Sequence, residues 1–206
     1  MLAVAVLYAG LEGYLWFPGA QYLLVVGAIF VWWRGPGWRA IGLRRPDSWP
    51  RAMSIAVALS FYQFVSLYVV EPLLARFSGE LPDVSMFKTL VGNEAELLFW
   101  LAISWSLAAF AEEMVFRGWL TARIAEVLGM TRNAWAIAIV ATSVIFGLVH
   151  LYQGLSGVIA TGIAGLLFGV AYLASDRNLW CAILAHGLTD TIGFVMIYLG
   201  VYPGLD

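Results

Sequence analysis

Long apolar stretches separated by short polar ones organise this chain. Stretches with few or no charges cover residues 14–33, 52–70, 97–128, 133–149, 151–175 and 179–200. A helix needs roughly 20 apolar residues to cross a bilayer, so each stretch predicts one membrane helix. Another apolar stretch, residues 1–10, comes first, and Pro18 interrupts the next, so residues 1–33 form either one long bent helix or two short ones. The pattern predicts an all-α, polytopic transmembrane bundle of about six to seven helices, forming a single integral membrane domain over residues 1–206.

Composition supports this assignment. The chain is 62% hydrophobic and 12% charged, whereas soluble domains are about 45–50% apolar and about 25% charged. No basic run with interleaved aromatics and no glycine-rich phosphate loop is present, so we expect no nucleic-acid partner. The single cysteine, Cys181, excludes an internal disulfide and a cysteine-based metal cluster. Because no cationic stretch precedes the first apolar run, we expect no cleaved signal peptide.

The polar connections predict the orientation in the membrane. The loop Arg34–Arg51 contains five arginines and should be cytoplasmic under the positive-inside rule. The turn with Arg123 and Arg132, two crossings later, and the turn with Arg177, two crossings after that, agree with this orientation. The dominance of arginine over lysine and the short chain favour a prokaryotic cell (inner) membrane.

The connection after the second apolar stretch is acidic. We expect Glu71-Pro72 to end the preceding helix, because proline disrupts a helix interior. Residues 71–96 then form a polar connection with a short interfacial helix, on the membrane face opposite the arginine-rich loop.

Candidate chemistry begins with two glutamates and an arginine in the third apolar stretch. Each ionisable group inside a membrane helix costs about 3 kcal/mol of insertion free energy. Such groups are therefore kept when they are paired with another group or have a function. Glu113 and Arg117 are four residues apart and share a helix face, so we expect Arg117 to hold Glu113. Glu112 lies about 100° round the axis and stays free to act. The alternative is an ion-paired helix end at the membrane surface.

Both histidines of the chain lie within or at the edge of apolar stretches. Phe146 and His150 are one helical turn apart, as are His186 and Asp190, so each pair shares a face. Intramembrane ionisable groups are functional candidates, because burying them without a role is costly.

The spacing in sequence also predicts how deep the candidate residues lie in the membrane. Glu112 and His150 are equally far in sequence from the turn at Thr131, so they should reach the same depth in an antiparallel helix pair. Counting from Arg177 places His186 somewhat nearer the cytoplasmic side, and a cavity at this depth could open to either face.

Three motifs, each on its own predicted membrane helix, together resemble one known family. Glu-Glu-x-x-x-Arg, Phe-x-x-x-His and His-x-x-x-Asp resemble the CAAX protease and bacteriocin-processing (CPBP, or Abi) family of intramembrane endopeptidases. The matching positions are Glu112, Glu113, Arg117, Phe146, His150, His186 and Asp190. The motif-bearing core covers about residues 97–200.

The resemblance implies peptide-bond hydrolysis inside the membrane, on a membrane-associated peptide or protein. The roles it implies are general base for Glu112, proton sharing for His150, orientation of the site for Glu113 and Arg117, and oxyanion stabilisation for His186 and Asp190.

One position departs from the family. Eukaryotic members usually have asparagine where this chain has Asp190, and an ionised carboxylate would repel an oxyanion. Asp190 is therefore protonated, orients His186, or helps to hold a metal. Glu112, His150, His186 and Asp190 could ligate Zn²⁺, and the family has been described both as metalloproteases and as glutamate proteases. The zinc signature His-Glu-x-x-His is absent, and we favour a glutamate mechanism without metal.

Other functions fit parts of the pattern. Gly-Leu-Ser-Gly around Ser156 matches the Gly-x-Ser-Gly of rhomboid serine proteases, with His186 as a candidate base. Close helix packing explains these glycines better, as it does the Gly-x-x-x-Gly of Gly165 and Gly169. A non-catalytic scaffold or a proton-coupled transporter would also keep buried ionisable groups. The chain has no repeated halves, which argues against a carrier.

Overall fold

A computed structural model describes residues 37–205, and this part of the chain contains helices and no strand. Four continuous helices are long and apolar enough to cross a membrane: Trp49–Ser78, Glu94–Val127, Leu151–Ala174 and Leu179–Tyr198. A fifth, shorter apolar helix is Arg132–Leu148. The predicted all-α, polytopic bundle is confirmed. The expected helix or helices of residues 1–33 lie outside the described residues.

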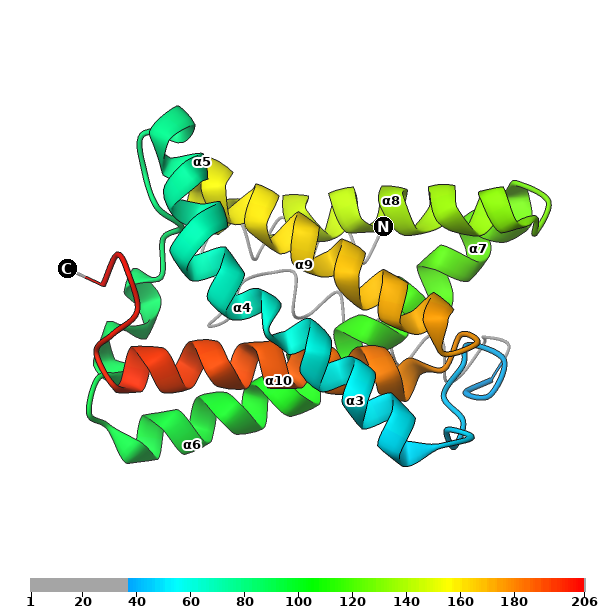
Figure 1. Ribbon diagram of the computed structural model, residues 1–206, viewed down its shortest axis with the longest axis horizontal. Coiled ribbons are helices and arrows are strands. Elements are labelled where there is room, and N and C mark those ends of the chain that lie inside the picture. The colour runs from blue at the N-terminus through cyan, green and yellow to red at the C-terminus, as the bar shows by residue number, and fades with distance from the viewer. Residues whose placement is uncertain (1–36, 206) are drawn as a thin grey trace, which may run out of the picture.

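Three of the four continuous helices are divided by local changes in winding. The first consists of α3 (Trp49–Ser60), α4 (Tyr62–Val65), the π-helical η1 (Ser66–Val70) and α5 (Glu71–Ser78). The second consists of α6 (Glu94–Ile103), the π-helical η3 (Ser104–Glu112) and η4 (Met114–Leu120), and α7 (Thr121–Val127). The rest are α8 (Arg132–Leu148), the short 3₁₀ turn η5 (Leu151–Gln153) with α9 (Gly154–Ala174), and α10 (Leu179–Tyr198). In Figure 1, α8 and α9 lie along one side, α6 and α10 along the other, and the first helix crosses between them.

Side-chain caps fix several boundaries where the sequence predicts them. Thr131 accepts a hydrogen bond from the Ala134 amide (3.1 Å) and begins α8. Asn178 accepts one from the Trp180 amide (3.0 Å) and begins α10. These oxygens satisfy amides that have no partner inside the helix. The tight turn before α10 contains Asp176 with positive φ.

The predicted helix end at Glu71-Pro72 is wrong. The helix continues through this pair and ends at Ser78, followed by Gly79 in the left-handed conformation (φ +87°). Pro72 stands in the first turn of α5, directly after the π-helical η1, where a missing amide is tolerated. The polar connection therefore covers only residues 79–93, and its short helix is the 3₁₀ helix η2 (Ser85–Leu90).

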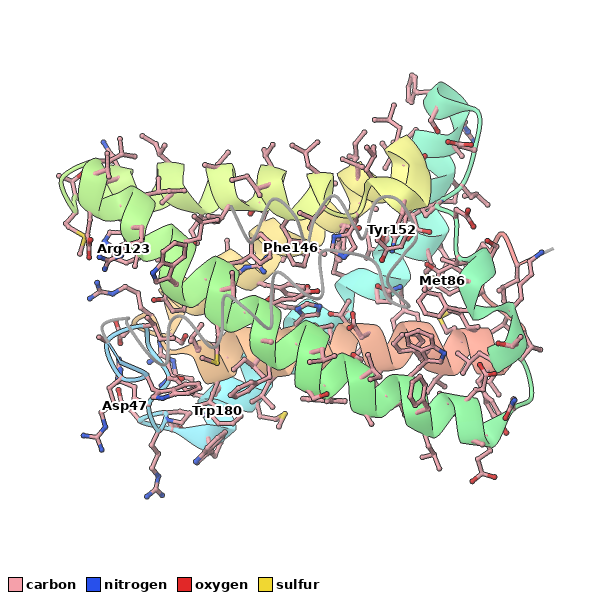
Figure 2. All side chains as sticks on the ribbon, turned by 180° about the vertical axis from the view of Figure 1, so that it is seen from behind. Asp47, Met86, Arg123, Phe146, Tyr152 and Trp180 are labelled. Atoms are coloured by element: carbon pink, nitrogen blue, oxygen red, sulfur yellow. The ribbon has the colours of Figure 1, made fainter. Side chains whose placement is uncertain are left out.

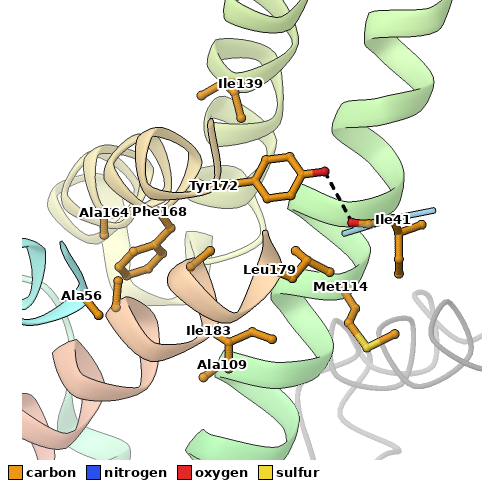
Figure 3. Packing of buried hydrophobic residues seen from close by; sticks show 12 residues of the cluster. Ile41, Ala56, Ala109, Met114, Ile139, Ala164, Phe168, Tyr172, Leu179 and Ile183 are labelled. Atoms are coloured by element: carbon orange, nitrogen blue, oxygen red, sulfur yellow. Dashed lines mark hydrogen bonds between the residues drawn. The ribbon is translucent and has the colours of Figure 1, made fainter. Parts of the chain in front are cut away.

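The packed interior lies where α8, α9 and α10 meet the second helix. Phe168, Tyr172 and Ile183 are buried there, and the Tyr172 hydroxyl donates a hydrogen bond to the Ile41 carbonyl (3.4 Å; Figure 3). The Gly-x-x-x-Gly motif makes room for side chains of neighbouring helices: a Cβ on Gly169 would lie 2.5 Å from a methyl group of Ile139 in α8.

The outward faces of the helices are apolar. Large exposed hydrophobic side chains on α8 and α9 include Ile137, Val144, Leu166 and Val170. A soluble protein seldom exposes such a continuous apolar surface, so these faces fit contact with lipid.

Candidate active site

One cavity of about 220 Å³ lies inside the bundle. Its lining includes Glu112, His150, His186 and Asp190, which come from η3, the end of α8 and α10. The two residues predicted to reach equal depth, Glu112 and His150, thus face the same space. His186, predicted somewhat nearer the cytoplasmic side, reaches it as well.

The helix that carries the two glutamates is π-helical on both sides of Glu113, with i→i+5 bonds in place of the expected α-helical ones. Such wide turns are rare and occur mainly at functional sites. The two neighbouring carboxylates have different surroundings here. Glu112 lines the cavity, whereas Glu113 is fully buried between helices.

Glu113 holds two partners at one oxygen. Arg117 Nη1 donates to Glu113 Oε1 at 2.8 Å, and His186 Nδ1 lies 2.9 Å from the same oxygen. Arg117 and Glu113 are 1% and 0% exposed, so the alternative of an ion pair at the membrane surface is wrong. The expected pair of Arg117 and Glu113 is present. The contact between Glu113 and His186 was not predicted.

Arg117 is fixed on its other sides as well. Its Nη2 donates to the Gly165 carbonyl at 2.8 Å, and its guanidinium carbon lies 4.4 Å from the centre of the Phe146 ring. A cation over an aromatic face is stabilised by the ring quadrupole, so Phe146 of the Phe-x-x-x-His motif helps to hold Arg117.

His186 lies between two carboxylates. Its Nδ1 faces Glu113, and its Nε2 is 3.6 Å from Asp190 Oδ2. Ser104 Oγ donates to the same Asp190 oxygen at 2.7 Å, and the His186 ring stacks on Phe168 with centroids 4.6 Å apart.

One ring nitrogen of His150, Nε2, has no hydrogen-bond partner in the part of the chain that the structure describes. Its Nδ1 lies 2.8 Å from the Phe146 carbonyl oxygen, which can only accept a hydrogen bond, so Nδ1 carries the proton. The Nε2 lone pair is then left to accept a proton. Figure 2 shows Phe146 in the interior of the molecule, with Tyr152 on the side of Phe146 that lies toward Met86.

Sequence reasoning did not identify Ser104 and Phe168, which hold Asp190 and His186 in place. Neither residue has a sequence signal, because serine and phenylalanine are ordinary in membrane helices. Both contacts arise only when α10 packs against η3 and α9.

The arrangement does not fit a metal site as it stands. Within residues 37–205, no three His, Cys, Asp or Glu side chains converge closely enough to hold a metal ion. Glu113 occupies His186 Nδ1, so only His186 Nε2, which lies 3.6 Å from Asp190 Oδ2, could face an ion. We therefore derive no chemical step through a metal.

Ser156 is not brought to the cavity. Its side chain is fully buried, and its hydroxyl donates to the Glu80 carbonyl at 2.7 Å and shares a hydrogen bond with the Ser78 hydroxyl at 2.7 Å. These contacts join the start of α9 to the end of α5, which is a structural role.

Gly165 is expected to tolerate no side chain. A Cβ there would lie 2.9 Å from Arg117 Nη2 and 3.0 Å from Phe146 Cδ1. Gly165→Ala should lower the free energy of unfolding in mixed micelles by about 1–3 kcal/mol, the usual cost of overpacking. The matched control in the same helix is Gly162→Ala, whose Cβ would lie 3.5 Å from the nearest atom, the Ser143 carbonyl oxygen. Equal stability of the two variants would contradict the tight packing around Arg117.

Comparison with known proteins agrees with the motifs. Residues 94–192 match the family model of type II CAAX prenyl endopeptidase Rce1-like proteins. No curated protein and no solved structure matches the chain. The matched segment runs from the start of α6 into α10 and contains all six candidate residues. Over this segment, just under half of the chain, the protein is similar to the Rce1-like CAAX proteases, in agreement with the three motifs.

Proposed function

We propose that this protein is an intramembrane endopeptidase in which Glu112 and His150 activate water against a peptide bond. The observation that carries the proposal is the shared cavity, which gathers the motif carboxylates Glu112 and Asp190 and two imidazoles inside an apolar bundle. Glu112 Oε2 is buried and has no hydrogen-bond partner among residues 37–205, so it is available to a water molecule. The substrate is a membrane-associated peptide or protein, as the family implies.

In the proposed reaction, Glu112 accepts a proton from water as the water oxygen attacks the carbonyl carbon of the peptide bond. His150 Nε2 shares that proton and helps to deliver it to the leaving nitrogen as the C–N bond breaks. The products are a new carboxyl group and a new amine. General acid–base catalysis of this kind contributes about 10²–10⁴-fold to the rate.

His186 is the proposed donor to the oxyanion. Its ring is held by Glu113 on one side and lies beside Asp190 on the other, so its position is set before substrate binds. A donor fixed in a dry site stabilises developing negative charge without reorganisation. In this scheme Asp190 orients the ring and does not itself contact the oxyanion.

The cavity extends toward the end of the bundle that carries the acidic connection. Its lining includes Pro82, Val84 and Phe87 of that connection, together with Tyr202. Tyr152 also lies toward Met86 and away from Asp47 and Arg123 in Figure 2. With the arginine-rich loop in the cytoplasm of a prokaryotic cell, substrate enters from the non-cytoplasmic side.

The experiment is cleavage of a library of palmitoylated peptides by the full chain reconstituted in liposomes, with products identified by mass spectrometry. We expect cleavage that persists in the presence of a chelator. Loss of cleavage on chelation, restored by zinc, would contradict the metal-independent mechanism. A scaffold or a transporter would cleave no peptide.

Ser156→Ala is expected to keep its cleavage rate within about threefold of wild type, because among residues 37–205 the Ser156 hydroxyl bonds only to Ser78 and Glu80. The measurement is the rate on the peptide that the wild type cleaves best. A folded Ser156→Ala protein without activity would instead indicate a serine nucleophile.

A further inference from the structure

A second buried carboxylate lines the cavity away from the motif residues. Glu71, in the first turn of α5, is 4% exposed and forms part of the cavity wall. Ser66 Oγ donates to its Oε1 at 2.8 Å, while its Oε2 is buried and has no hydrogen-bond partner within the described residues. Glu71 lies outside residues 94–192, so the family match assigns it no role.

A carboxylate with an unsatisfied buried oxygen destabilises the protein that carries it. Its retention is explained if a ligand supplies the missing partner. The helix is also π-helical directly before Glu71, over Ser66–Val70, as it is beside Glu112. Local winding of this kind is frequent at functional sites.

The charge of the cavity indicates what that partner is. Its described lining contains three carboxylates, those of Glu71, Glu112 and Asp190, and no lysine or arginine. Arg117 is close in sequence, but it is fully occupied by Glu113 and Gly165 behind the wall. An unpaired carboxylate in such a site favours a cation with N–H donors.

We propose that Glu71 binds a basic side chain, lysine or arginine, of the peptide substrate while the scissile bond lies at Glu112. This substrate preference rests on the proposed peptidase function. Tyr62 and Gln63, which precede Glu71 on the same continuous helix, also line the cavity, and the Tyr62 hydroxyl donates to the Ala160 carbonyl at 3.0 Å. The Tyr62 oxygen and the Gln63 amide oxygen can accept further N–H groups of the same cation.

The test is a binding measurement that does not depend on cleavage. The probes are fluorescent palmitoylated peptides of neutral sequence with one lysine moved along the chain, each paired with a norleucine control of similar length. The inactive full-length Glu112→Gln protein, in phosphatidylcholine nanodiscs, is titrated into each peptide. Binding is measured by the fluorescence anisotropy of the peptide. At one lysine position we expect binding about tenfold tighter than its norleucine control, as for one charged hydrogen bond.

The protein-side variant is Glu71→Gln in the Glu112→Gln background, which keeps an acceptor for Ser66 but removes the charge. The lysine preference should disappear, whereas it should survive Glu94→Gln, an exposed glutamate outside the cavity. Equal binding of lysine and norleucine peptides at every position would overturn the proposal, as would a preference that survives Glu71→Gln.

A cleavage assay on the same peptides with wild-type protein separates this inference from the function on which it rests. Cleavage without any lysine preference would leave the peptidase in place and remove the role of Glu71. Lysine-dependent binding without cleavage would retain the cation site and remove the peptidase.

Discussion

Glu112→Gln is expected to lower the rate of peptide hydrolysis by at least about a thousandfold. The amide has the same shape as the carboxylate but cannot accept a proton from water. Because Glu112 Oε2 has no hydrogen-bond partner among the described residues, the substitution removes no structural contact there. The free energy of unfolding should therefore stay within about 1 kcal/mol of the wild-type value.

The measurement is kcat on the best-cleaved palmitoylated peptide, with unfolding in mixed micelles as the check on folding. The matched control is Glu94→Gln, which changes an exposed glutamate at the start of α6 and should keep wild-type activity. A Glu112→Gln rate close to that of Glu94→Gln would remove Glu112 from the mechanism.

Arg117→Met is expected to lower the free energy of unfolding by about 3–5 kcal/mol, the cost of removing one partner from a buried ion pair. Methionine keeps much of the volume but leaves the Glu113 charge without its cation and the Gly165 carbonyl without its donor. It also removes the cation from the face of Phe146.

The control is Arg123→Met, because Arg123 pairs with Glu126 at an exposed position in α7. Exposed pairs contribute about 0–1 kcal/mol, so this variant should unfold nearly as wild type does. Adding Glu113→Gln to Arg117→Met should recover part of the lost stability by removing the isolated charge. If Arg117→Met were as stable as Arg123→Met, Arg117 would not anchor the site.

Much of the fold follows from local rules that the sequence carries. Apolar stretches of sufficient length predict the membrane helices, and the observed caps Thr131 and Asn178 lie just before the predicted stretches 133–149 and 179–200. The helix through Glu71-Pro72 could not be predicted in this way. Its continuation depends on a change of winding before Pro72 and on packing of its end against α9 through Ser78 and Ser156.

The site shows the same division between local and distant contacts. The Glu113–Arg117 pair is four residues apart on one helix, so its spacing predicts it. The contact of His186 with Glu113 joins residues 73 positions apart, and the contact of Ser104 with Asp190 joins residues 86 positions apart. No spacing rule predicts these contacts, because they depend on how α10 packs against the second helix. Glu71 carries no motif and is identified only by its place in the cavity wall.

The central claim, that Glu112 directs a water molecule to a peptide bond, is tested most directly by one turnover in water labelled with heavy oxygen. The wild-type protein is used in excess over the best-cleaved peptide, and the new carboxyl group is analysed by mass spectrometry. The account predicts one heavy oxygen in that carboxyl group from the first turnover, since the attacking oxygen comes from solvent. An unlabelled carboxyl group in the first turnover would show that a protein carboxylate had attacked the peptide carbonyl in place of water and supplied its own oxygen, and would contradict the account.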